Sequence, residues 1–106
     1  RKRATGRMPD LYTLVEGRPT PCKAAVTWGR WFETEDRVLL TTVLNDVTVS
    51  TVFLGLDHNR GRGAPILWQT MIFGGPQDGY QNRYTSAAAA VEGHERAVKI
   101  ATASTA

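Results

Sequence analysis

The sequence predicts an α+β fold, in which a four-stranded antiparallel meander, in the order β-α-β-β-β-β-α, has two helices packed on one face. Residues 37–56 contain two runs rich in β-branched residues and leucine. Between the runs, Asn45-Asp46 tolerates the left-handed backbone of a tight hairpin turn. Residues 66–73 carry apolar side chains on both faces, which is typical of a central strand. The stretch after Ser86 has helical periodicity. Because short turns join the later strands, these strands should run antiparallel.

The first part of the chain predicts one strand and one helix. Residues 11–15 form a strand candidate, and residues 16–19 have the composition of a turn. Thr20 is suited to cap a helix, and Pro21 is suited to its first position, where a missing N–H costs nothing. The apolar stripe of this helix consists of Ala24, Trp28, Trp31 and Phe32. The acidic residues that follow oppose the dipole at the helix C-terminus, so we expect a short helix.

The last part of the chain predicts an edge strand and a second helix. Residues 74–79 carry strong turn signals, and Tyr80–Tyr84 alternates aromatic and polar residues, as an exposed edge strand does. Ser86 is suited to cap the helix that follows. The expected apolar stripe of this helix consists of Ala87, Val91, His94, Val98 and Ala101. On this stripe, we expect His94 to be a partly buried packing residue.

The length of 106 residues fits one domain, to which we assign residues 8–106, preceded by a disordered basic arm of residues 1–7. Four of the 13 basic residues lie in this arm, which leaves nine basic against ten acidic residues in the domain. The near-neutral domain argues against nucleic-acid binding, except through the arm. A second interpretation is that the arm is sequence upstream of a start at Met8.

Cysteine content and hydropathy indicate a cytoplasmic protein. Cys22 is the only cysteine, which excludes an intrachain disulfide and fits a reducing compartment. No apolar run approaches the roughly 18 residues that a membrane-spanning helix needs. The basic N-terminus is not followed by the apolar segment of a secretory signal. We therefore expect no membrane contact.

The loop between the second and third long strands gathers most of the residues that could form a site. The candidate ligand-binding residues in it are Asp57, His58, Asn59, Arg60 and Arg62. An imidazole titrates near physiological pH, and an adjacent carboxylate can orient it or raise its pKa. A glycine after each arginine allows backbone N–H groups to approach an anion. The alternative is that Asp and Asn form a turn, that the histidine bonds the loop backbone, and that the arginines are solvated.

Known catalytic and metal-binding patterns are missing from the chain. The sequence contains no HExxH motif, no cysteine pair, no GxSxG elbow and no Walker loop. We therefore assign no catalytic residues, no metal site and no cofactor, and we favour a protein that is not an enzyme. The alternative is a small hydrolase or nucleotide-modifying enzyme that uses Asp57 and His58.

Two segments carry a resemblance to a protein family. Val49–His58 (VSTVFLGLDH) and Pro65–Gly75 (PILWQTMIFGG), followed by Tyr84 and Gly93-His94, resemble small proteins of tailed phages and prophages of the actinobacterial phage type. That group has no assigned activity, so the resemblance implies a setting rather than a reaction. Gln69, a further candidate ligand-binding residue, stands where the family pattern usually has Glu. If that Glu served as an acid or base, this chain would lack it.

Taken together, these features predict a phage or prophage accessory protein that acts in the host cytoplasm. It would be a non-enzymatic binding module for a host or phage protein or for a small anionic ligand. A second hypothesis is a minor structural component of a phage particle. The Tyr80–Tyr84 edge also allows pairing with a second copy of the chain, which would form a homodimer.

Overall fold

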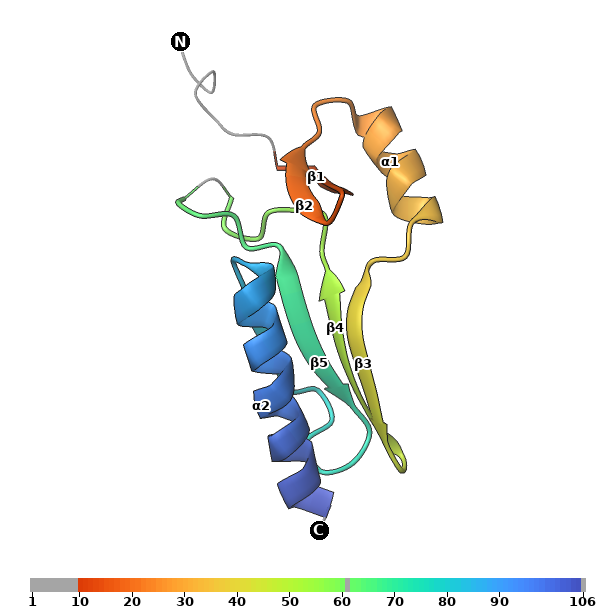
Figure 1. Cartoon of the computed structure of the whole chain (residues 1–106), viewed down its shortest axis with the longest axis vertical. Helices are drawn as coiled ribbons and strands as arrows, with labels where there is room; N and C mark the ends of the chain where they lie inside the picture. The colour runs from red at the N-terminus through yellow and green to blue at the C-terminus, as the bar shows by residue number, and fades with distance from the viewer. Residues whose placement is uncertain (1–9, 61, 106) are drawn as a thin grey trace. The chain divides into compact units, whose positions relative to one another are not determined.

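The computed structural model describes residues 10–60 and 62–105, with the side chains of 104 and 105 excepted (Figure 1). The predicted basic arm at residues 1–7 lies outside the described residues. The chain forms two compact units. Unit 1 consists of the described residues up to Asp36 together with Gly55–Ile66, and unit 2 consists of Arg37–Leu54 together with the residues from Leu67 onward.

Unit 1 contains a β-hairpin and a helix. Strand β1 (Tyr12–Val15) pairs antiparallel with β2 (Arg18–Pro21), and helix α1 (Ala25–Thr34) follows. The turn between the strands needs only Glu16 and Gly17, whose φ angles are 51° and 78°.

The predicted start of the first helix at Thr20 and Pro21 was wrong, because both residues belong to β2. A two-residue turn brings Arg18 directly opposite Val15, so the segment after the turn continues as a strand. Pro21 is tolerated there because it is the last residue of a two-stranded sheet. The helix instead begins after Ala24, which makes no side-chain capping bond.

Trp28 holds unit 1 together. Its indole Nε1–H donates to the carbonyl oxygens of Tyr12 and Gly55, each at 3.0 Å, and its ring lies 4.7 Å from that of Phe32. Gly55 has a φ of +75°, and a Cβ atom there would lie 3.4 Å from both aromatic rings. A glycine is therefore required for the backbone conformation at this position, and it also allows the close approach of α1.

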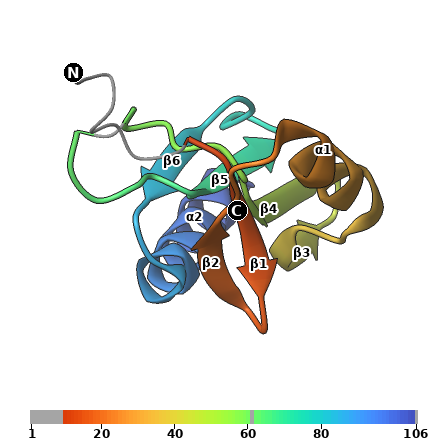
Figure 2. The same cartoon turned by 90° about the horizontal axis from the view of Figure 1, so that it is seen from above.

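Unit 2 is built on the expected antiparallel meander. Strands β3 (Val38–Leu44), β4 (Val47–Phe53), β5 (Trp68–Phe73) and β6 (Gln81–Tyr84) lie in the order β3-β4-β5-β6, so β5 is a central strand as predicted. The hairpin turn between β3 and β4 places Asn45 in the left-handed region, with a φ of 56°. Helix α2 (Ala87–Thr105) lies along one face of this sheet (Figures 1 and 2). Ser86 caps it, because its Oγ accepts the backbone N–H of Ala89 at 3.1 Å.

The buried face of α2 differs from the predicted stripe. The buried helix residues are mostly small ones: Ala90, Gly93, His94, Ala97 and Ala101. Val91, which was expected on this face, is 37% exposed. Small side chains let the helix backbone approach the sheet closely, and a Cβ atom at Gly93 would overlap the Tyr84 ring. The side of the helix that is buried is therefore the one whose small residues allow close approach, and not the one with the largest apolar side chains.

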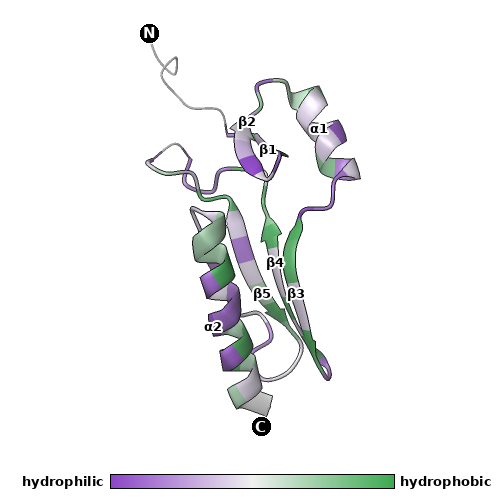
Figure 3. Cartoon of the chain, in the orientation of Figure 1, coloured by the Kyte–Doolittle hydropathy of each residue, from purple (hydrophilic) through white to green (hydrophobic). Residues whose placement is uncertain are grey.

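The other face of the sheet carries exposed apolar side chains. Figure 3 shows that β3 and β4 are largely apolar. Val43 on β3 is 66% exposed and Phe73 on β5 is 49% exposed, whereas Val49 and Ile72 on the helix-facing side are fully buried. We call the surface that bears Val43 and Phe73 the open face.

Gly93 and Gly29 provide a matched pair for testing the close approach of α2. Gly93→Ala places a methyl group inside the Tyr84 ring position, so we expect a loss of about 1–3 kcal/mol in unfolding free energy, despite the better helix propensity of alanine. Gly29→Ala in α1 meets nothing within 4 Å and should stabilise by about 0.5–1 kcal/mol. Urea denaturation measures both. Equal effects of the two substitutions would contradict this packing.

Candidate functional site

A chain of four polar side chains lies between α2 and the sheet. Thr51 Oγ1 is 2.5 Å from Thr70 Oγ1 and 2.8 Å from His94 Nδ1, and His94 Nε2 is 2.9 Å from Thr42 Oγ1. Thr51 and Thr70 are directly opposite each other on β4 and β5, and both are fully buried. His94 is 4% exposed. Both imidazole nitrogens are therefore engaged, and the four side chains together connect α2 to three strands.

The positions of the hydrogen atoms in this series of hydrogen bonds follow from the requirement that each buried hydroxyl hydrogen has an acceptor. A neutral imidazole donates through one nitrogen and accepts through the other. If Nδ1 carried the hydrogen, one buried hydroxyl hydrogen on Thr51 or Thr70 would lack an acceptor, at a cost of about 1–3 kcal/mol. In the other tautomer, Thr70 donates to Thr51, Thr51 donates to Nδ1, and Nε2–H donates to Thr42. We therefore assign this second tautomer, which leaves the Thr42 hydroxyl hydrogen free.

The surroundings of His94 keep its imidazole neutral. Burial lowers the pKa of His94, and the charge of neighbouring Glu95 opposes that effect. The residues that face the ring from β3, β4 and β5 through the hydrogen-bond chain are uncharged threonines. A proton added at Nδ1 would also displace the Thr51 hydroxyl hydrogen that this nitrogen accepts. A neutral ring is thus favoured by burial and by hydrogen bonding.

The outer end of the hydrogen-bond chain opens into a groove. The groove has a volume of about 490 Å³ and is lined by residues of β3 and α2, namely Leu40, Thr42, Val91, His94, Glu95, Val98 and Lys99. We call it the α2–β3 groove. Its walls are mainly aliphatic, and its polar atoms come from the Thr42–His94 pair and from the two charged residues. Its size falls within the range of about 300–1,000 Å³ that is usual for small-molecule sites.

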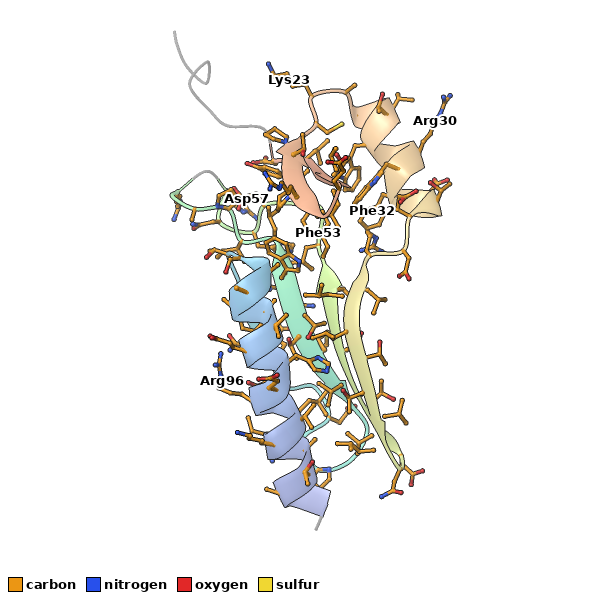
Figure 4. All side chains as sticks on the ribbon, in the orientation of Figure 1. Lys23, Arg30, Phe32, Phe53, Asp57 and Arg96 are labelled. Atoms are coloured by element: carbon orange, nitrogen blue, oxygen red, sulfur yellow. The ribbon has the colours of Figure 1, made fainter. Side chains whose placement is uncertain are left out.

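Asp57, by contrast, organises the loop that the sequence analysis singled out in unit 1. Asp57, labelled in Figure 4, is 4% exposed. Its Oδ1 accepts the backbone N–H groups of Asn59 at 2.7 Å and Ile66 at 3.0 Å. These bonds join the two ends of the loop. Asp57 therefore has a structural role as an acceptor for backbone amides.

His58 is exposed and is oriented by the backbone. Its Nδ1–H donates to the carbonyl oxygen of Leu56 at 2.8 Å, which leaves Nε2 as the nitrogen with a free lone pair in the neutral ring. A backbone carbonyl thus occupies the position that an orienting carboxylate takes in many catalytic histidine sites.

The other predicted site residues fall into two groups. Arg60 and Arg62 are exposed, so anion binding by the loop stays a prediction. Asn59 closes the loop, because its side-chain amide donates to the carbonyl oxygen of Ala64 at 2.8 Å. Gln69 lies in unit 2 on β5, and its Oε1 accepts from Nε of Arg83 at 2.9 Å. A Glu at position 69 would form a cross-strand ion pair with this arginine, so position 69 has a structural use in the sheet.

Comparison of the chain with protein-family models, with curated proteins and with solved structures finds no match. Within residues 10–60 and 62–105, no cluster of three His, Cys, Asp or Glu side chains could hold a metal ion. In the same part of the chain, no helix is long and apolar enough to cross a membrane.

The α2–β3 groove was missed by sequence reasoning. Periodicity placed His94 on an apolar stripe, and nothing local indicated that its partners would be threonines from two different strands. One signal was present, because Thr51 and Thr70 occupy positions of buried strands where apolar residues are usual. Buried hydroxyl groups need hydrogen-bond partners, and the histidine of the helix provides one of them.

The lowered pKa of His94 predicts a pH-dependent stability. The folded pKa lies below the ordinary value of 6.5, so the unfolded chain takes up a proton first as the pH falls. The unfolding free energy should be constant between pH 7 and 8, and below about pH 6.5 it should fall by up to about 1.4 kcal/mol per pH unit. Urea denaturation between pH 5 and 8 measures this slope. His94→Asn should remove it, and an unchanged slope in that variant would contradict the assignment to His94.

Asp57 and His58 should differ strongly in their effect on stability. Asp57→Ala leaves two loop amides without their acceptor, so we expect a loss of about 2–3 kcal/mol in unfolding free energy. His58→Ala removes one exposed hydrogen bond and should change this energy by less than about 0.5 kcal/mol. Thermal denaturation of the two variants checks this contrast. A large loss for His58→Ala would contradict the exposed placement of the ring.

Proposed function

We propose that this protein is a small non-enzymatic binding module and that the α2–β3 groove is its ligand site. The observation that carries the proposal is an open groove of about 490 Å³ in which a buried histidine and a threonine present polar atoms between aliphatic walls. Ligand sites typically combine a concave apolar surface with a few oriented polar groups. The groove has this character, and its polar groups are held in place by contacts with three strands.

The state of the histidines supports binding rather than catalysis. His94 is buried and neutral, and both of its nitrogens are engaged, so it positions Thr42 instead of exchanging protons with a substrate. In the 57–63 loop, the carboxylate of Asp57 accepts backbone amides and Nδ1 of His58 donates to a carbonyl. A hydrolase that uses Asp57 and His58 remains the alternative, and its activity should disappear in His58→Ala without a loss of stability.

The resemblance of Val49–His58 and Pro65–Gly75 to small proteins of tailed phages and prophages supports an accessory role in a phage-infected or lysogenic host. We place the protein in the host cytoplasm, where a ligand-binding module would act on host or phage metabolites. A minor virion component is the alternative. Immunodetection in purified particles and in host lysate separates the two locations.

The open face supports a second candidate function, which is binding to a protein, either a host or phage partner or a second copy of this chain. Val43 and Phe73 expose apolar surface on neighbouring parts of this face. Strand β3 is a sheet edge without a charged residue, whereas β6 is short and carries Arg83. Charged residues and short length protect sheet edges from pairing, so β3 is the less protected edge. The expected dimer edge is therefore β3 rather than Tyr80–Tyr84.

Two matched valine variants test where ligands bind. A fragment screen by ligand-observed NMR on the whole chain identifies binders, and each binder is then tested against Val91→Glu and Val43→Glu. Both valines are exposed, at 37% and 66%, but only Val91 lines the groove. We expect Val91→Glu to weaken binding at least about tenfold, because it places a charge against an apolar ligand, and Val43→Glu to have no effect.

Two outcomes of this screen would count against the groove as the site. If Val43→Glu abolishes binding and Val91→Glu does not, the open face is the functional surface. If no fragment binds the chain at all, the ligand-binding function itself fails.

A further inference from the structure

We infer that the α2–β3 groove selects ligands in which an aliphatic body carries a hydrogen-bond acceptor oxygen, as in an acyl amide or a carboxylate. The inference rests on the proposed function and names the ligand class of the same site. Three features of the groove lead to it: the direction of the hydrogen-bond chain, the aliphatic walls, and the charges beside them.

The direction of the hydrogen-bond chain gives the groove a donor. Three hydroxyl groups and one imidazole N–H supply four hydrogens for three contacts, so one hydrogen is left over. Thr70 is fully buried, and its side chain makes no other hydrogen bond within the described residues. The spare hydrogen therefore belongs to Thr42, the member of the chain that is partly exposed and lines the groove.

The donor at Thr42 is oriented and strengthened by its partners. Its oxygen accepts the Nε2–H of His94, and each hydroxyl of the chain that donates while it accepts polarises the next one. A ligand that approaches Thr42 with an acceptor oxygen completes this series. A ligand that approaches with an N–H or a cationic group would meet the only hydrogen of the chain that has no acceptor.

The walls of the groove fit an aliphatic body. Leu40 on β3 and Val91 and Val98 on α2 supply the apolar surface. An aliphatic chain can contact all three residues without leaving a polar group of the protein unpaired. Its burial is favourable in proportion to the apolar area removed from water.

The charges in the groove allow two sources of the acceptor. Lys99 favours a carboxylate and Glu95 disfavours it, and the two residues lie one helical turn apart on α2. A carboxylate and a neutral acyl carbonyl share the acceptor oxygen that Thr42 recognises. The balance between Lys99 and Glu95 decides which of them binds more tightly, and the experiment compares both.

The test uses three probes of matched chain length on the full protein: hexanamide, hexanoate and hexylamine. Each is titrated while the methyl resonances of Leu40, Val91 and Val98 are followed by NMR. We expect saturable shifts with hexanamide or hexanoate and at least tenfold weaker binding of hexylamine, which carries no acceptor oxygen. Stronger binding of hexanoate than of hexanamide would identify the carboxylate as the source, and the reverse order would identify the neutral carbonyl.

Two variants at Thr42 provide the second measurement. Thr42→Val removes the hydroxyl at nearly the same volume and should weaken binding of the acyl probes about tenfold, while Thr42→Ser keeps the hydroxyl and should preserve it. The comparison of probes on the unaltered protein does not depend on whether Thr42→Val folds. Equal binding of hexylamine and the acyl probes, or unchanged binding in a folded Thr42→Val protein, would overturn the inference.

The result also separates this inference from the proposed function. If the fragment screen finds ligands in the groove but none of the acyl probes shifts the three methyl groups, the ligand class is wrong and the binding function stands. If the screen finds no ligand either, both fail.

Discussion

One buried imidazole and three threonines form the hydrogen bonds that connect α2 to β3, β4 and β5. His94 contacts Thr42 on β3 and Thr51 on β4, and Thr51 contacts Thr70 on β5. A polar chain in a core is favourable only when all of its buried hydrogens have acceptors, so the positions of α2 and of the three strands are mutually constrained. The same constraint leaves a hydrogen-bond donor at the edge of the groove.

The small residues of α2 make this arrangement possible. Ala90, Gly93 and Ala97 are buried, and they let the helix backbone approach the sheet near β4, β5 and β6. The larger residues Val91 and Val98 then lie beside β3, where they form walls of the groove instead of filling the core. Close packing on one side of the helix and an open groove on the other therefore have the same origin.

The strands and the second helix could be predicted from local sequence, because their determinants are local. The β-branched runs around Asn45-Asp46, the two-sided apolar character of β5 and the cap at Ser86 each specify an element without reference to the rest of the chain. Strand β2 was missed because its pairing depends on a turn of only two residues. Local sequence does not reveal that residues 18–21 pair with residues 12–15. Residues 18–21 were therefore assigned to a turn and to the start of a helix.

The candidate site depended on contacts that are distant in the sequence. Position 94 is separated from Thr42 by 52 residues and from Thr51 by 43, and a periodic pattern carries no information on such pairs. The loop residues Asp57 and His58 were predicted to form a site because a carboxylate and an imidazole can both bind ligands and exchange protons. In the structure both side chains form hydrogen bonds with the loop backbone instead. Asp57 bonds the amides of Asn59 and Ile66, and His58 bonds the carbonyl of Leu56.

The route of the chain has an architectural consequence. Leu54 follows the last residue of β4, and Leu67 precedes the first residue of β5. The backbone N–H of Leu54 donates to the carbonyl oxygen of Leu67 at 2.6 Å. Residues 55–66 thus leave the β4–β5 hairpin and return to it at adjacent points, as an inserted module does. Because the entropy of loop closure rises only slowly with length, about 0.6 kcal/mol per doubling, such an insertion can lengthen or shorten during evolution while the register of the host sheet is preserved.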